Sequence, residues 1–227
     1  MKSRKIVDIM YYIDENTLEA YLTSCMNNGI TWLAPFMLKE IDYSKILVSA
    51  DTPLVFDSSI RRTSLPLNVK LLPYTDKKIM FVESPKNSIV VSGKFSGCYM
   101  GRYWKDDKKF VCHIATGGGT NGECENYFNQ IPDAIKFKPS LIIKEIDYKD
   151  IIKKKCADYN FIFNPIDDVY GIITYGDELY SLIVAKQNNV FYVMAWAKWS
   201  IQNKKQKLDA LFAKYDELYP YLASPWN

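Results

Sequence analysis

The chain has 227 residues and a formal net charge of +3 at pH 7; 48% of its residues are hydrophobic and 24% are charged. This composition excludes a disordered protein, and the length is sufficient for a large apolar core without metal or disulfide cross-links. Because lysines and acidic residues are interspersed along the chain, without a concentrated basic segment, nucleic acid is not the expected partner.

The chain shows no internal boundary and no export signal. No repeat, low-complexity segment or Pro/Gly/Ser linker divides it, so we expect residues 1–227 to form a single domain and a monomer. The basic N-terminus is followed by a short apolar stretch that Asp8 interrupts, which does not match a signal peptide. No later segment approaches the ~20 apolar residues of a membrane span. These features predict a protein made in the cytoplasm.

The cysteines predict free thiols and no metal centre. Their number is odd, and no two have the spacing of metal ligands or of a CxxC redox pair (Cys25, Cys98, Cys112, Cys124 and Cys156). The chain also contains a single histidine, which disfavours a zinc site. We therefore expect a reducing compartment, with neither a metal ion nor another cofactor.

The first half of the chain predicts one helix followed by short strands. Residues 14–29 have apolar side chains at the 3–4 spacing of one helix face, with Asp14 as the N-cap and Gly29 after the last turn. Short segments rich in β-branched and aromatic residues then alternate with turn residues, as strands do. These predicted strands cover residues 45–49, 67–72, 78–83, 88–93, 98–104 and 109–115.

The second half predicts further strands between helices. Residues 120–131, 147–157 and 200–222 have helical patterns, and Ser200 is a candidate N-cap for the last of them. The strand candidates are residues 141–146, 169–175, 178–186 and 189–199. We interpret the whole as an α+β fold, a mixed or antiparallel β-sheet sandwich flanked by helices at both ends.

Cys98 and His113 fall on two neighbouring predicted strands joined by residues 105–108. Side chains alternate between the faces of a strand, so the loop length sets which residues lie opposite each other. A two-residue turn at the start of this loop places Cys98 opposite His113, whereas a four-residue loop places Met100 there and Cys98 on the diagonal. Both registers put Cys98 and His113 on one face, with Cβ atoms roughly 5 Å or 7–8 Å apart, and Cys112 on the other.

Such a pair suits nucleophilic catalysis. The thiolate is the nucleophilic form of cysteine, and a neighbouring imidazolium can lower the thiol pKa by several units. A third group orients the imidazole, and Ser92, at the end of the preceding strand, offers its hydroxyl or its backbone carbonyl. Gly97 lets a substrate approach and leaves the amide of Cys98 free to face an oxyanion. The structural alternative is a buried cysteine acting as a small hydrophobe beside a hydrogen-bonded core histidine.

The segment Phe95-Ser96-Gly97-Cys98, with a histidine fifteen residues later on the next strand, resembles the Ser-Gly-Cys…His signature of bacterial glutamine deamidase toxins. This family includes the catalytic domain of cytotoxic necrotizing factor and Burkholderia lethal factor. The likeness covers about twenty-five residues and has one departure, Phe95 in place of leucine. The dipeptide order separates it from the chemoreceptor deamidases, which have Gly-Ser before the cysteine.

The resemblance implies a deamidase-toxin-like fold and a protein-glutamine deamidase, a hydrolase that converts a glutamine side chain of a host protein to glutamate. It makes Cys98 the nucleophile, His113 the acid and base, and Ser92 the third catalytic group, with Ser96 and Gly97 at the substrate and the oxyanion. The family targets are a translation initiation helicase, hence translation inhibition, or a small GTPase. The chain would then be a bacterial effector and virulence factor that acts in the host-cell cytosol after delivery.

Two other function classes fit the same residues. One is a non-enzymatic binding or inhibitor protein in which Cys98 and His113 are structural. The other is a different thiol hydrolase or a transglutaminase, which uses an amine in place of water.

The glycine-rich segment 115–123 lacks a GK[ST] motif and predicts a loop beside His113 in preference to a nucleotide site. The aromatic residues between Phe191 and Trp199 are expected in the core.

Overall fold

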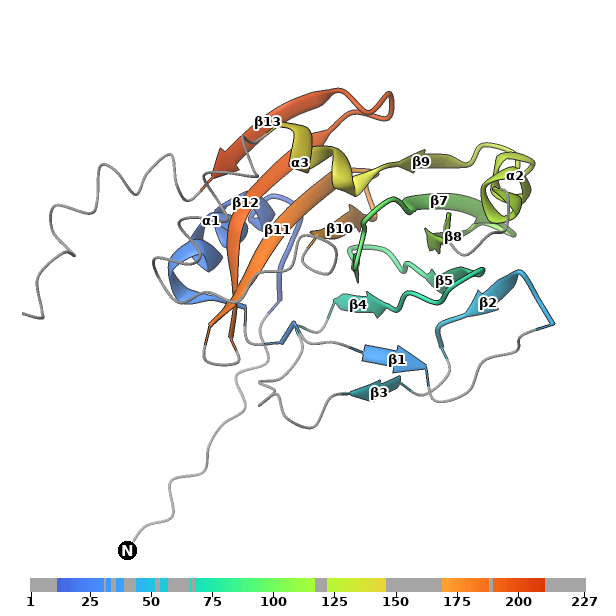
Figure 1. Cartoon of the computed structure of the whole chain (residues 1–227), viewed down its shortest axis with the longest axis horizontal. Helices are drawn as coiled ribbons and strands as arrows, with labels where there is room; N and C mark the ends of the chain where they lie inside the picture. Colours follow the sequence, from blue (N-terminus) through green and yellow to red (C-terminus); the bar gives the residue numbers. More distant parts are fainter. Residues whose placement is uncertain are drawn as a thin grey trace, which may run out of the picture.

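The computed structural model of the chain describes residues 12–30, 32–33, 36–38, 44–51, 54–56, 66, 68–116, 122–145, 169–187 and 190–210. These residues form an α+β fold that consists mostly of two mixed β-sheets with few helices (Figure 1). The α+β class expected from the sequence is therefore confirmed. Among the described helices, none is long and apolar enough to cross a membrane.

Six of the described strands form the larger sheet, in the order β13-β12-β11-β10-β6-β4. Its neighbouring strands are antiparallel except β4 and β6, which run parallel. The strands are β4 (Val69–Leu72), β6 (Ile89–Gly93), β10 (Val169–Thr174), β11 (Leu179–Gln187), β12 (Val190–Trp199) and β13 (Lys205–Ala210).

Five other described strands form the second sheet, in the order β2-β5-β8-β7-β9, with β2 parallel to β5 and the remaining pairs antiparallel. A separate two-stranded ribbon consists of β1 (Phe36–Leu38) and β3 (Leu54–Phe56). The strands of the five-stranded sheet are β2 (Leu47–Ser49), β5 (Ile79–Glu83), β7 (Tyr99–Lys105), β8 (Lys108–Ile114) and β9 (Ile135–Phe137).

Two of the helices cover the outer faces of these sheets. Helix α1 (Leu18–Asn28) packs against β12 of the six-stranded sheet, and α2 (Glu123–Asn129) packs on the far face of the five-stranded sheet. Helix α1 begins after Thr17, because the Asp14 carboxylate accepts a hydrogen bond from the Thr17 amide at 2.8 Å in the turn before the helix. Asp14, the predicted N-cap, therefore lies in the turn that precedes α1 and not at its N-cap position.

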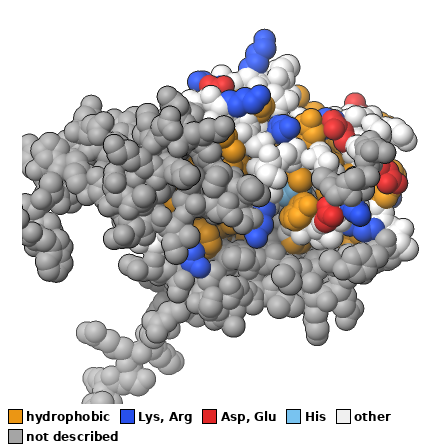
Figure 2. All heavy atoms as spheres, in the orientation of Figure 1, with side chains coloured by type: hydrophobic (Ala, Val, Ile, Leu, Met, Phe, Trp, Pro, Cys, Tyr) orange, Lys and Arg blue, Asp and Glu red, His pale blue; other side chains and the backbone are white. Residues whose placement is uncertain are grey.

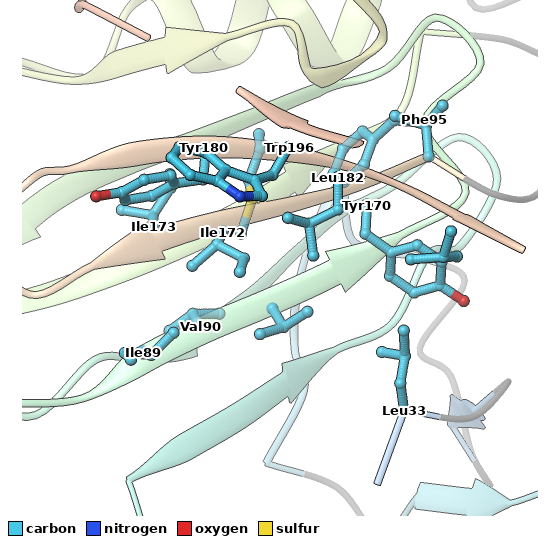
Figure 3. Packing of buried hydrophobic residues seen from close by; sticks show 14 of the residues in the cluster. Leu33, Ile89, Val90, Phe95, Tyr170, Ile172, Ile173, Tyr180, Leu182 and Trp196 are labelled. Atoms are coloured by element: carbon cyan, nitrogen blue, oxygen red, sulfur yellow. The ribbon is translucent and has the colours of Figure 1, made fainter. Parts of the chain in front are cut away.

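The main core lies between the two sheets and beneath α1, and Figure 3 shows part of it. Every position of β10 is buried, because one face of this strand is covered by α1 and the other by the five-stranded sheet. Along β6, Ile89 and Val91 line a small apolar cavity with Leu18 of α1. Since side chains alternate along a strand, Val90 and Ser92 face the five-stranded sheet. Ser92 is thus held between the sheets, on the side of Cys98 and His113.

The structure contradicts two predicted elements. Residues 141–145 are not a strand, because Pro139 at the first helical position starts a 3₁₀ turn, η1 (Pro139–Leu141), that continues into helix α3 (Ile142–Glu145). Residues 205–210, inside the predicted C-terminal helix, form β13 and pair with β12. Backbone pairing with an open sheet edge outweighs helical side-chain spacing at this place. Residues 200–204 are also not helical, because they form the turn between β12 and β13. Residues 211–222 of that helix and the predicted helix at 147–157 lie outside the described residues.

Candidate active site

Cys98 and His113 both face the core between the sheets. His113 lies near the end of β8 and pairs with Met100 of β7, so Cys98, just before β7, is on its diagonal. The turn itself is shorter than the four-residue loop that predicts this register, because only Asp106 and Asp107 form it, with φ of 51° and 58°. Cys98 belongs to the main core and Cys112 to the separate cluster beneath α2, which confirms that the two thiols lie on opposite faces.

Both site residues are buried. Cys98 is 5% exposed and His113 is 1% exposed. In the space-filling view of Figure 2, a small area in the histidine colour is visible between hydrophobic and other side chains, in keeping with the slight exposure of the chain's single histidine. The site therefore lies beneath the surface.

Ser92 fixes one nitrogen of His113. The Ser92 Oγ lies 2.6 Å from the Leu72 carbonyl oxygen and 2.7 Å from His113 Nδ1. A hydroxyl has one proton, and the carbonyl can only accept, so Ser92 donates to Leu72 and accepts from His113 Nδ1–H. The neutral imidazole then carries its proton on Nδ1 and a lone pair on Nε2. Of the two groups that Ser92 offers, its hydroxyl makes this contact.

Two aromatic rings hold the plane of the imidazole. The Phe95 ring is stacked on it with a centroid separation of 4.1 Å and an interplanar angle of 8°. Tyr74 approaches with a centroid separation of 5.1 Å and a tilt of 53°. Phe95 is completely buried, whereas Tyr74 is half-buried and its hydroxyl donates to Asp76 at 3.2 Å. His113 is therefore constrained both at Nδ1 and across its ring.

The free edge of His113 is chemically unusual. Nε2 is buried and has no hydrogen-bond partner in the described part of the chain. An unpaired polar atom in a protein interior costs about 1–3 kcal/mol, and such atoms are rare in folded proteins. Cys98, just before β7, faces the same core as His113, and its thiol is not hydrogen-bonded to Nε2. A buried imidazole nitrogen with an unpaired lone pair, on the face that also carries a thiol, is a candidate general base.

The resting charges differ from the expected ion pair. Burial lowers the pKa of His113 to about 3. Burial also raises the pKa of the Cys98 thiol, although hydrogen bonds from the backbone and the side chain of Thr116 act in the opposite direction. At neutral pH the pair is a neutral imidazole and a neutral thiol. The expectation that an imidazolium activates the cysteine is therefore wrong for this resting structure, because burial leaves neither the imidazolium nor the thiolate solvated.

Thr116 is a site residue that the sequence did not single out. Hydrogen bonding from its backbone and its side chain lowers the pKa of the Cys98 thiol, and its Oγ1 lies 3.6 Å from where a Cβ on Gly97 would be. Both donors favour a thiolate, since they stabilise negative charge on sulfur. Thr116 follows β8 within the segment predicted to lie beside His113, and residues 117–121 of that segment are outside the described residues.

Ser96 and Gly97 lie on the outer side of the site. Ser96 is exposed, and Gly97 is half-buried. A Cβ added at Gly97 would make only an ordinary contact with Thr116, whereas one at Gly101 would be 2.6 Å from Phe128 Cζ and 2.8 Å from the backbone oxygen of Ile135. The packing of the chain thus requires a glycine at 101 but not at 97.

The other candidates have structural explanations. Phe191, Trp196 and Trp199 are buried in the core, as expected. The remaining described cysteines, Cys25, Cys112 and Cys124, are buried free thiols. Cys156 lies outside the described residues. Within the described ranges, no group of His, Cys, Asp and Glu side chains could hold a metal ion.

No family model, no curated protein and no solved structure matches this chain. Its function is therefore inferred from the site itself.

Proposed function

We propose that the chain is a protein-glutamine deamidase with Cys98 as nucleophile, His113 as general base and acid, and Ser92 as the group that orients His113. The observation that carries this proposal is the Ser92–His113 hydrogen bond, which leaves Nε2 as an unpaired base on the face where Cys98 lies, just before β7. The Ser-Gly-Cys…His resemblance supplies the reaction class, and a deamidase-toxin-like fold is part of the proposal.

The chemistry begins from the neutral pair. The Cys98 proton moves to His113 Nε2 as Sγ bonds to the amide carbon, and the Thr116 donors stabilise the charge on sulfur during this transfer. The carbonyl oxygen becomes an oxyanion that the backbone amide of Cys98 can stabilise. Nε2–H then protonates the amide nitrogen, and the C–N bond breaks. Ammonia departs, and the glutamine acyl group remains bound to Cys98 as a thioester.

Water completes the cycle. His113 Nε2 accepts a proton from the water as its oxygen bonds to the thioester carbon, and the carbon–sulfur bond then breaks. Glutamate is released, and the proton returns from Nε2 to the Cys98 sulfur. Access to the site supports a side-chain amide as substrate, because the carboxamide at the end of a glutamine is slim and flexible enough to reach a nucleophile that is 5% exposed.

The proposed substrate is a host protein, with a translation initiation helicase or a small GTPase as the class that the resemblance indicates. The test incubates the chain with a purified protein of each class and a glutamine-containing peptide, and follows ammonia release and the amide-to-acid mass change. Cys98→Ala is expected to abolish both signals. Cys112→Ala removes a buried thiol on the opposite face and is the matched control. Equal ammonia release by Cys98→Ala and the unmodified chain would rule out this mechanism.

A binding protein is the second candidate, and the raised thiol pKa of Cys98 together with the missing Cys98–His113 hydrogen bond favours it. On that alternative, Cys98 and His113 stabilise the core, and no glutamine substrate releases ammonia. Cys98→Ala would then alter stability alone, so the same experiment separates the two functions.

Gly97→Ala provides a sharper test of the site. The protein has room for this Cβ, so stability is expected to change by less than about 0.5 kcal/mol. Activity is expected to fall by about tenfold or more, because the methyl group occupies the approach to the Cys98 amide. Gly101→Ala is the reverse case and is expected to destabilise the fold through its contact with Phe128. Thermal unfolding and ammonia release measure both variants; unchanged activity in Gly97→Ala contradicts an approach over this residue.

A further inference from the structure

Phe95 is held rigidly although it lies outside the strands. It follows β6 and precedes Cys98 by three residues. Its amide donates to the Val169 carbonyl at 3.0 Å, which ties it to the first residue of β10, and its side chain is completely buried. A loop residue with a paired backbone and a buried ring can define the position of its neighbours.

The neighbour that Phe95 defines is His113. A hydrogen bond from Nδ1 to Ser92 holds one edge of the imidazole, and rotation of the ring about its Cβ–Cγ bond breaks that hydrogen bond. The stacked Phe95 ring, 4.1 Å away and inclined by 8°, removes this rotation because a turned imidazole would collide with it. The two contacts together fix the direction of the Nε2 lone pair.

The six-stranded sheet supports both contacts at one place. Gly171 of β10 pairs with Ser92 of β6. A Cβ on Gly171 would lie 3.2 Å from Phe95 Cε2 and 2.8 Å from Met100 Sδ, so the absence of a side chain there allows the Phe95 ring to sit close to β10. Ser92 and Phe95 therefore share a backing strand, while His113 belongs to the other sheet.

We propose that Phe95 is a positioning residue for His113, which together with Ser92 keeps the imidazole in one orientation and one tautomer so that Nε2 serves Cys98. This role rests on the proposed deamidase function. It also gives a physical reason for phenylalanine in place of leucine, since a branched aliphatic side chain offers no flat surface to an imidazole.

The test compares Phe95→Leu with Phe128→Leu, which removes a ring of the same size from the separate core cluster beneath α2. Phe95→Leu is expected to lower kcat on the order of 100-fold with KM nearly unchanged, because a small displacement of a catalytic base has effects of that size. Phe128→Leu is expected to lower thermal stability about as much as Phe95→Leu does, because each removes a buried ring, and to leave kcat within about threefold of the unmodified chain.

Nitrogen-15 NMR of the single histidine provides a readout that does not need a substrate. The unmodified chain and Phe128→Leu are expected to show one tautomer with the proton on Nδ1, and Phe95→Leu a mixture of tautomers. Phe95→Met, which fills the space without a ring, repeats the test if the leucine variant does not fold.

The two readouts separate the two proposals. A single Nδ1–H tautomer in the folded Phe95 variant, leucine or methionine, overturns the positioning role, whatever the activity. If no glutamine substrate is turned over by the unmodified chain, the deamidase function fails, and the tautomer mixture alone decides whether Phe95 positions His113.

Discussion

Lowering the pH from about 8 to about 5 is expected to remove about 2 kcal/mol of stability through His113 alone. The ordinary histidine pKa of 6.5 applies to the unfolded chain, and burial lowers it to about 3 in the folded protein. Between these values the unfolded chain binds a proton that the folded chain does not, so stability is complete above pH 6.5 and is lost as the pH falls toward 3. The slope is about 1.4 kcal/mol per pH unit for one proton.

The measurement is urea unfolding at several pH values between about 8 and 5, where few carboxylates titrate. The chain contains one histidine, so His113→Gln removes the only imidazole and is the natural comparison. Its free energy of unfolding is expected to vary much less over this interval, whatever its absolute stability. Parallel curves for the two proteins would mean that His113 is hydrated and titrates normally in the folded state.

Asp177→Asn is expected to destabilise the protein by about 3 kcal/mol or more, with a fall in Tm of roughly 10 °C. Asp177, in the turn between β10 and β11, accepts from Arg102 Nη2 at 2.8 Å and from Lys109 Nζ at 2.6 Å. The Lys109 side chain is 0% exposed, and the other two donors of its ammonium group go to the carbonyl oxygens of Thr174 and Tyr175. Loss of the carboxylate leaves the buried Lys109 and the partly buried Arg102 without a counter-charge.

Asparagine keeps the shape of the side chain and tolerates the positive φ of 67° at this position, so the effect isolates the charge. Glu83→Gln makes the same chemical change in an exposed ion pair, that of Glu83 with Lys108. The Lys108 side chain is 59% exposed and the Glu83 side chain 37%. That variant is expected to lose less than about 1 kcal/mol. Thermal unfolding of both variants provides the comparison, and equal losses would show that the Asp177 pair is solvated like a surface pair.

Strand content was accessible from the sequence because alternation and turn residues are local properties. Four central strands, β5 to β8, begin and end within one residue of their predicted bounds. The sequence predicts no strand at β9 and a helix at β13, because both are edge strands whose formation depends on a neighbouring strand. Such pairing is decided by the tertiary structure, which local side-chain patterns do not encode.

The candidate site was accessible in its parts but not in its electrostatics. Parity along the strands placed Cys98 and His113 on one face, and the position of Ser92 before the turn suggested a contact with the imidazole. The depth of the site was not accessible, because burial depends on what the other sheet and the loops contribute. That depth determines the direction of both pKa shifts, and the contacts of Thr116 and Phe95 with the pair also arise from tertiary packing.

The way the two sheets divide the site also sets when it can form during synthesis. The thiol, the imidazole and the Ser92 hydroxyl all belong to the first 113 residues, yet the strand that carries Ser92 is completed by β10, which begins at Val169. The amide of Phe95 is likewise paired only when Val169 is present. A nascent chain that has emerged from the ribosome only as far as β9 therefore holds every reactive group but not their arrangement.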